Sequence, residues 1–222
     1  MKFSQRTALL CALGLSVAAG TAAQFAQQAP QAPKIPTPFT PVVGSGAQYQ
    51  VTTRDGKMTF TYAVVGKEQV DGNDAYWLEI RSDGAMLKGE MVIKELTLGV
   101  GTHPEIKRMI MQPPGRPPME MPAGMIGMMK EHMAQNGNSQ KNGMGEKIAT
   151  ESITVPAGAF ECDHFRRKEN DMDVDYWISS KVPPYSLVKM SGPDTSMVLE
   201  KVLTGEITHI KGEAQKMEMP DY

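Results

Sequence analysis

The sequence predicts a mainly β (α+β) protein: a curved antiparallel sheet of about 10–11 strands that forms a half-barrel. Three observations support this fold class. Apolar and polar residues alternate through most of the chain from residue 46 onward, as in strands with one buried face. Turn sequences rich in glycine, proline and aspartate separate these runs at hairpin spacing, which favours antiparallel pairing. Only residues 122–135, inside an insertion over 113–145, have the spacing of an amphipathic helix.

The strands before the insertion are predicted from alternation and from the turns between them. Residues 49–53 and 58–64 alternate on either side of an Asp55–Gly56 turn, so we expect them to form a first hairpin. Residues 71–74 make the next turn. The further strands expected before the insertion are 75–81, 86–98 and 105–112.

The insertion begins with a proline-rich segment over 113–118, which excludes a strand there. The helix that follows is expected to cover the apolar face of the sheet, because an open sheet needs such a cover. The residues spaced to share one face of this helix are Met125, Met128, Met129, His132 and Met133. The strands expected after the insertion are 151–155, 159–168, 172–179, 185–190, 196–203 and 206–211.

The N-terminal segment has the pattern of a cleavable signal peptide. Lys2 and Arg6 precede an apolar run over 8–19 that is too short to span a bilayer comfortably, and cleavage is expected after Ala23, with Ala26 as a second possibility. We therefore expect a periplasmic or secreted protein with no transmembrane segment in the mature chain. The expected organisation is a signal peptide at 1–23, a disordered Pro/Gln/Ala-rich linker at 24–45, the β domain at 46–212 and a C-terminal tail at 213–222.

Charge and motifs argue against nucleic-acid binding and catalysis. The formal net charge is −2, so the chain has no electrostatic reason to bind nucleic acid. Cys162, the one cysteine left after cleavage, cannot form an intramolecular disulfide, and with His164 it lacks the third group of a nucleophilic triad. The sequence also lacks a phosphate-binding loop and a nucleophile elbow. We expect a protein that is not an enzyme and has no cofactor.

Methionine is the unusual component, since nine of the 18 methionines fall between residues 109 and 144. Thioethers are soft ligands that suit Cu(I), whereas a methionine-rich helix also makes a deformable apolar surface. The apolar interpretation is favoured, because methionines at helical spacing more often pack than coordinate metal. The alternative Cu(I) site would use Met119, Met121, Met125, Met128, Met129 and His132.

Two Tyr–Trp pairs add aromatic candidates to this helix. Adjacent residues of a strand face opposite ways, so one ring of each pair should lie in the core and the other on the surface. The rings serve either as core anchors or as the lining of a ligand cavity. The predicted ligand-binding residues are Met125, Ile126, Met128, Met129, Met133, Tyr76, Trp77, Tyr176 and Trp177.

Several turn and strand motifs resemble a known family. They are Val155-Pro156-Ala157-Gly158-Ala159-Phe160, Tyr176-Trp177-Ile178-Ser179 and Val182-Pro183-Pro184-Tyr185, with Lys107-Arg108-Met109-Ile110 and Pro117-Pro118-Met119-Glu120 earlier in the chain. On these motifs the chain resembles exported bacterial domains of unknown function, some of which are similar to the half-barrel of LolA- and LolB-type periplasmic lipoprotein carriers. The resemblance implies that fold, an exported location and, by analogy, an apolar concavity.

These expectations combine into one leading function and two alternatives. The leading function is a non-enzymatic periplasmic binding protein for an apolar ligand: a lipid or acyl chain, a lipoprotein anchor or a hydrophobic protein segment. The first alternative is a periplasmic Cu(I)-binding protein that uses the methionine-rich insertion. The second alternative is a structural envelope protein that binds a protein partner.

Overall fold

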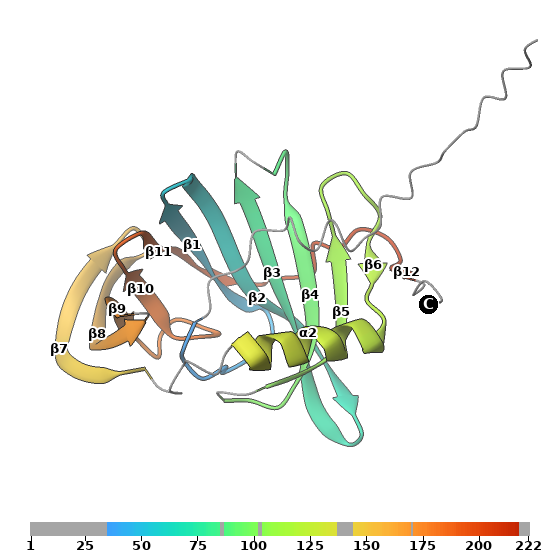
Figure 1. Ribbon diagram of the computed structural model, residues 1–222, viewed down its shortest axis with the longest axis horizontal. Coiled ribbons are helices and arrows are strands. Elements are labelled where there is room, and N and C mark those ends of the chain that lie inside the picture. The colour runs from blue at the N-terminus through green and yellow to red at the C-terminus, as the bar shows by residue number, and fades with distance from the viewer. Residues whose placement is uncertain (1–34, 85–86, 102–103, 137–143, 170, 218–222) are drawn as a thin grey trace, which may run out of the picture. The chain divides into compact units, whose positions relative to one another are not determined.

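The computed structural model describes residues 35–84, 87–101, 104–136, 144–169 and 171–217, and this part of the protein is mainly β. A twelve-stranded sheet has the order β12-β6-β5-β4-β3-β2-β1-β11-β10-β9-β8-β7 (Figure 1). Neighbouring strands pair antiparallel, except that β12 and β6 pair parallel. The sheet ends at β12 and β7, so it is open and does not close into a barrel. The predicted mainly β, antiparallel fold class is confirmed.

The strands are β1 (Ser45–Thr53), β2 (Gly56–Val70), β3 (Asn73–Gly84), β4 (Met91–Leu98), β5 (Glu105–Gln112), β6 (Met119–Glu120), β7 (Glu146–Val155), β8 (Gly158–Glu169), β9 (Met172–Ile178), β10 (Leu187–Ser191), β11 (Thr195–Thr204) and β12 (Gln215–Lys216). Two of them, β6 and β12, have only two residues each. Such short strands carry no alternation signal, and this explains why the sequence predicts fewer strands than the sheet has.

The β2–β3 hairpin shows how local sequence sets the register of the sheet. Its turn is Asp71–Gly72, and both residues have positive φ, at 51° and 77°. That is the conformation of a type I′ turn, which aspartate and glycine adopt most readily. Val70 therefore pairs with Asn73, and this register holds as far as Gly66 opposite Trp77. A β-bulge between Val64 and Gly66 then shifts it and places the core residues Val64 and Leu78 opposite each other.

The main core joins two groups of strands, β1–β3 and β8–β11, which are called the two wings of the sheet below. Buried side chains from β1, β2 and β3 form one cluster with buried side chains from β8, β9, β10 and β11. Tyr49 of β1 links the wings, since its hydroxyl donates a 2.9 Å hydrogen bond to the carbonyl oxygen of Leu187 in β10. Because strands from both wings contribute to one cluster, the sheet curves around it. The face that carries this cluster is called the inner face below.

The segment before β1 is packed against the core, which corrects the prediction of a disordered linker as far as residue 45. Phe39 is 1% exposed, belongs to the main core and lies 5.6 Å, centroid to centroid, from the ring of Tyr185. Backbone hydrogen bonds of 2.8 and 2.9 Å join Phe39 and Gly101 in both directions. A buried aromatic ring and long-range pairing thus order this segment despite its prolines. The predicted signal peptide and the linker before residue 35 lie outside the described residues.

Residues 206–211 form an extended segment without strand pairing, although their alternation predicts a strand. This segment lies on the outer face of β3, where the fully buried carboxylate of Glu79 holds it. That carboxylate accepts hydrogen bonds from the hydroxyl of Thr208 at 2.6 Å and from the backbone N–H of His209 at 3.0 Å. Hydrogen bonds to the side chain of Glu79 in β3 therefore hold this segment in place of backbone pairing with a neighbouring strand. Beyond this segment, the predicted tail over 213–222 begins with β12, which pairs with β6.

The helix α2 (Ala123–Asn136) crosses the strands near β5 (Figure 1). It covers the region in which the sequence predicts a helix. No helix in the described part of the chain is long and apolar enough to cross a membrane. The buried side of α2 packs on a second apolar cluster, separate from the main core. This methionine cluster consists of the buried residues Met109, Met111, Met121 and Ile126 and the partly buried residues Ile93, Ile106, Met125 and Met129.

Candidate ligand-binding site

The strand β4 carries two hydrogen-bonding side chains to the inner face of the sheet. Glu95 pairs with Leu78 of β3 and with Met109 of β5. Residues directly opposite each other in a ladder share a face, and Leu78 belongs to the main core, so Glu95 lies on the inner face. Thr97 is two residues further along β4 and lies on the same face. These two residues are called the Glu95–Thr97 pair below.

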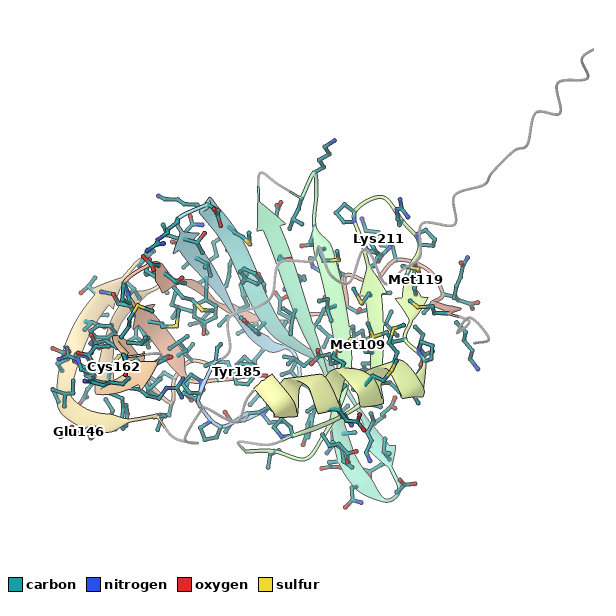
Figure 2. All side chains as sticks on the ribbon, viewed as in Figure 1. Met109, Met119, Glu146, Cys162, Tyr185 and Lys211 are labelled. Atoms are coloured by element: carbon teal, nitrogen blue, oxygen red, sulfur yellow. The ribbon has the colours of Figure 1, made fainter. Side chains whose placement is uncertain are left out.

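The Glu95–Thr97 pair lies on the boundary between the two apolar clusters. On the β3 side, its partners Leu78 and Tyr76 pack in or against the main core. On the β5 side, its partners Met109 and Ile106 belong to the methionine cluster under α2; Met109 is labelled in Figure 2. Two hydrogen-bonding groups thus interrupt an otherwise apolar surface at the place where the two clusters meet.

The hydroxyl of Thr97 is unpaired within the described residues. The residue is 3% exposed, and its Oγ1 has no hydrogen-bond partner there. Leaving a buried hydroxyl unpaired costs about 1–3 kcal/mol. Folded proteins keep few such groups, and those they keep have a reason such as an ordered water or a ligand.

The carboxyl group of Glu95 has no ion pair or hydrogen bond within the described residues either. Burial raises the pKa of this carboxyl group from an ordinary value of 4.5 to about 7. Burial also raises the pKa of Tyr62 and of Tyr185, and the negative charge of Glu95 raises both further. The phenol groups therefore stay neutral near a carboxyl group that is itself close to half-ionised at neutral pH.

The cationic side chains closest to Glu95 in sequence and in pairing lie on the outer face, against Trp77. The Nζ atom of Lys94 is 4.8 Å from the centroid of the Trp77 ring, and the Cζ atom of Arg108 is 5.2 Å from it. The indole N–H of Trp77 donates a 3.1 Å hydrogen bond to Glu68. These cations are thus engaged on the far side of the sheet, and neither neutralises Glu95.

The four predicted aromatic residues lie in different environments. Tyr176 is buried in the main core, and Tyr76 packs against that core on the inner face. Trp77 lies on the outer face, whereas Trp177 is partly buried, packs against the main core and stacks on the imidazole of His164 at 4.3 Å between centroids. The first pair therefore has one ring on each face, whereas both rings of the second pair contact the main core. Of the four, only Tyr76 borders the Glu95–Thr97 pair in the strand register.

The buried face of α2 includes Ile126 and excludes Met128, which differs from the face predicted by the methionine spacing. Met125, Ile126 and Met129 pack in the methionine cluster, whereas Met128 is 58% exposed. Ile126 is 3% exposed and is the most buried of the side chains described for the helix, those of residues 123–131. The spacing of the methionines placed Met128 on the buried face, whereas Ile126, also among the predicted ligand-binding residues, lies there instead.

The predicted Cu(I) ligands are brought together in part. Met121 is buried in the methionine cluster beside the two partly buried helix methionines, and Met119 in β6 is partly buried. The side chains of His132 and Met133 lie outside the described part of the structure. Within the described ranges, no group of three or more His, Cys, Asp or Glu side chains could hold a metal ion.

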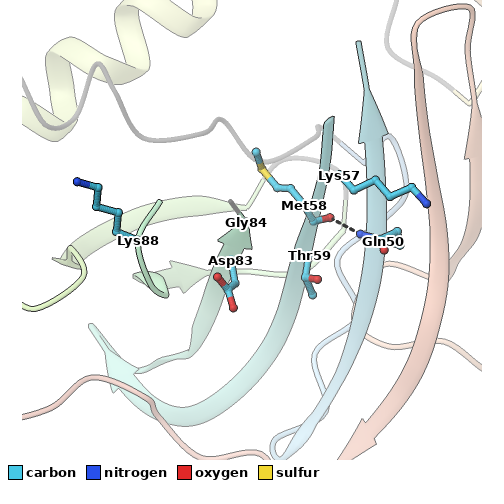
Figure 3. A pocket seen from close by; sticks show the side chains of 7 residues that line it. All are labelled: Gln50, Lys57, Met58, Thr59, Asp83, Gly84 and Lys88. Carbon is cyan, nitrogen blue, oxygen red and sulfur yellow. Dashed lines mark hydrogen bonds between the residues drawn. The ribbon is translucent and has the colours of Figure 1, made fainter. Parts of the chain in front are cut away.

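A surface hollow of about 420 Å³ lies elsewhere on the sheet, at the open ends of β2 and β3 (Figure 3). Its lining residues are Gln50, Lys57, Met58, Thr59, Asp83, Gly84 and Lys88. It shares no residue with the Glu95–Thr97 pair. Because the hollow is wide open and mostly polar, it does not suit an apolar ligand.

No protein-family model matches the chain, and no curated protein matches it in sequence. Two solved structures are loosely similar to it. One is a candidate exported protein with a YmcC-like fold from Bacteroides fragilis NCTC 9343, with 14% identity and a TM-score of 0.35 over 75% of this chain and 99% of that one. The other is a candidate lipoprotein from Parabacteroides distasonis ATCC 8503, with 14% identity and a TM-score of 0.37 over 78% of this chain and 100% of that one.

These values are too low for either structure to indicate a ligand or a location for this chain. Export and the similarity to LolA- and LolB-type carriers therefore stay predictions from the sequence.

The sequence does not single out Glu95 and Thr97, because both faces of β4 carry apolar residues. Ile93 precedes them on the inner face, while Val92 and Leu96 are buried on the outer face. Alternation then gives no sign of which face meets the core. The strand register supplies that information, since it places Glu95 opposite Leu78 of the main core.

Proposed function

We propose that this chain is an exported, non-enzymatic binding protein for an apolar ligand. The ligand would lie between the main core and α2, against the Glu95–Thr97 pair. The observation that carries this proposal is the methionine cluster, an apolar cluster that is separate from the main core and holds α2 on the sheet. The signal-peptide pattern at the N-terminus supports export.

The methionine cluster suits a helix that moves to admit a ligand. α2 contacts the sheet mainly at β5, and it does so through Met125, Ile126 and Met129. Methionine side chains are unbranched and flexible, so they repack around a new neighbour at little cost. A ligand entering here would replace contacts between α2 and β5 and leave the main core intact.

An acyl or alkyl chain is the ligand class that this arrangement fits best. The flanking surface is apolar on both sides, and the Glu95–Thr97 pair gives it one polar point. A molecule with an apolar chain and a polar head would place one part on each. A lipoprotein anchor shares this chemistry, whereas a hydrophobic protein segment does not have the single polar end.

Fluorescence titration with N-phenylnaphthylamine, a neutral apolar reporter, tests the proposal on the mature protein. The test variant is Ile126→Asp, which removes a buried apolar contact of α2 with the methionine cluster. Its matched control is Met128→Asp, the same change on the exposed side of the same helix. We expect the wild type and the control to bind alike and Ile126→Asp to bind about tenfold more weakly, because a charge in the cluster undocks the helix.

Equal weakening by both variants would show that the site is not under α2. Circular dichroism should show the β spectrum unchanged in Ile126→Asp, which separates loss of the site from loss of the fold. Native mass spectrometry of protein purified from its producing cells would then identify any acyl mass that the protein retains. Failure of the wild type to bind the reporter or any acyl molecule would refute the proposal.

Cu(I) binding is a second candidate, because the methionine cluster brings several thioethers to one place. Met109, Met111 and Met121 are buried there, next to the helix methionines. Thioethers are soft ligands and suit Cu(I). Competition with a Cu(I) chelator measures the affinity, and Met121→Leu should lower it while leaving apolar reporter binding unchanged. Retained Cu(I) affinity in that variant would exclude this site.

A further inference from the structure

We infer that the apolar ligand carries a primary ammonium head group, which the carboxylate of Glu95 and the hydroxyl of Thr97 bind. The ligand class is thus a cationic amphiphile with an unbranched apolar chain. This inference rests on the proposed function and names the chemistry of its ligand. The geometry behind it is the buried, unpaired hydroxyl of Thr97 and the carboxylate of Glu95, which has no ion pair or hydrogen bond among the described residues. Both lie on one strand face, at the boundary of two apolar clusters.

The spacing of the two side chains suits one small donor group. Residues two apart on a strand are separated by about 7 Å, and the longer glutamate side chain can shorten the gap between the oxygen atoms. An ammonium group has several N–H donors and no acceptor, so it can donate to a carboxylate and to a hydroxyl oxygen together. Such a head group would satisfy both unpaired groups at once.

The charge on this part of the inner face selects the sign of the head group. Lys94 and Arg108, the cations that neighbour Glu95, are held on the outer face by Trp77. A carboxylate head group would therefore meet a like charge with no neighbouring cation, whereas an ammonium group would meet its counter-ion. The raised pKa of Glu95 agrees with this, because it marks a carboxylate that lacks a positive partner.

Competition among three ligands of equal chain length tests the inference. Dodecylamine, dodecanol and lauric acid, each below its micelle concentration, displace N-phenylnaphthylamine from the mature protein. A charge-assisted hydrogen bond distinguishes the amine from the other two, so we expect dodecylamine to displace the reporter at about tenfold lower concentration. Native mass spectrometry with dodecylamine detects the complex directly if the reporter gives no signal.

Two near-isosteric variants and one control assign the effect to the pair. Glu95→Gln should remove the preference for the amine and leave the affinity for the neutral reporter within about twofold. Thr97→Val should reduce the preference by several-fold. Thr59→Val, a threonine in a strand away from the pair, should change nothing.

Three results of the displacement experiments would overturn the inference. They are equal displacement by the amine and the alcohol, stronger displacement by lauric acid, and an amine preference that survives Glu95→Gln. Reporter binding without any head-group preference would leave the proposed function standing and would assign the unpaired groups to ordered water. Absence of a dodecylamine complex in the mass spectrum would refute the ammonium assignment directly.

Discussion

Replacing Glu95 by glutamine should stabilise the ligand-free protein at alkaline pH and have little effect at acidic pH. Burial raises the pKa of the folded protein's carboxyl group from 4.5 to about 7. The folded state therefore favours the protonated carboxyl group more than the unfolded state does, and stability falls as pH rises from about 4.5 through about 7. Glutamine resembles the neutral acid in shape and does not ionise in this range.

The size of the effect follows from the difference between the folded and unfolded pKa. At about 1.4 kcal/mol for each pKa unit, ionised Glu95 costs the folded state roughly 3 kcal/mol once the pH is above both values. At about pH 5 the group is protonated in the folded protein and the cost is mostly absent. The stability difference between Glu95→Gln and wild type should therefore grow by roughly 2–3 kcal/mol between about pH 5 and about pH 8.5.

Urea unfolding followed by circular dichroism at these two pH values measures that difference. Glu161→Gln, at an exposed position of β8, is the control and should show no pH-dependent gain. Wild type and both variants should unfold with equal m-values, which keeps the comparison within a two-state description. A stability difference for Glu95→Gln that is the same at both pH values would refute the burial of an unpaired carboxylate on the inner face.

Other predictions concern the parts of the fold that hold the site. Phe39→Ala should lower the free energy of unfolding by about 3–5 kcal/mol, because it leaves a cavity in the main core; no loss would restore the linker prediction. Glu79→Ala should cost about 2–4 kcal/mol and increase hydrogen exchange over residues 206–211, whereas unchanged exchange there would show that Glu79 does not hold this segment. Cys162 should react slowly with iodoacetamide in the folded protein, because burial raises the pKa of its thiol to about 11; reaction as fast as in urea would contradict that burial.

Much of the β architecture could be predicted because its signals are local. The turn at Asp71–Gly72 needs only the two residues that adopt positive φ, and the strands on either side show their own alternation. The position of α2 was equally accessible, since proline excludes strands before it and apolar spacing marks the helix itself. These features depend on a few neighbouring residues, which a single sequence contains.

The features that sequence missed depend on contacts between distant parts of the chain. Phe39 is ordered by Gly101 and by a ring from the loop before β10, so its proline-rich surroundings gave the wrong indication. The segment over 206–211 is held by Glu79, more than a hundred residues earlier. The candidate site also depends on contacts between distant residues, because the pairing of β4 with β3 and β5 places Glu95 on the face that meets the core.

The cost of ionising Glu95 in the folded protein and the binding of the proposed ligand are thermodynamically linked. A ligand that binds only the folded state stabilises it, and an ammonium group that pairs with Glu95 would offset the cost of ionising that carboxyl group. Alkylammonium groups stay protonated up to about pH 10, and Tyr62 and Tyr185, which face Glu95, have pKa values raised above 10. Dodecylamine should therefore raise the melting temperature of the wild type more at about pH 8 than at about pH 5, and that of Glu95→Gln equally at both. If the thermal shift of the wild type does not depend on pH, the ligand does not pair with Glu95 and its head group binds elsewhere.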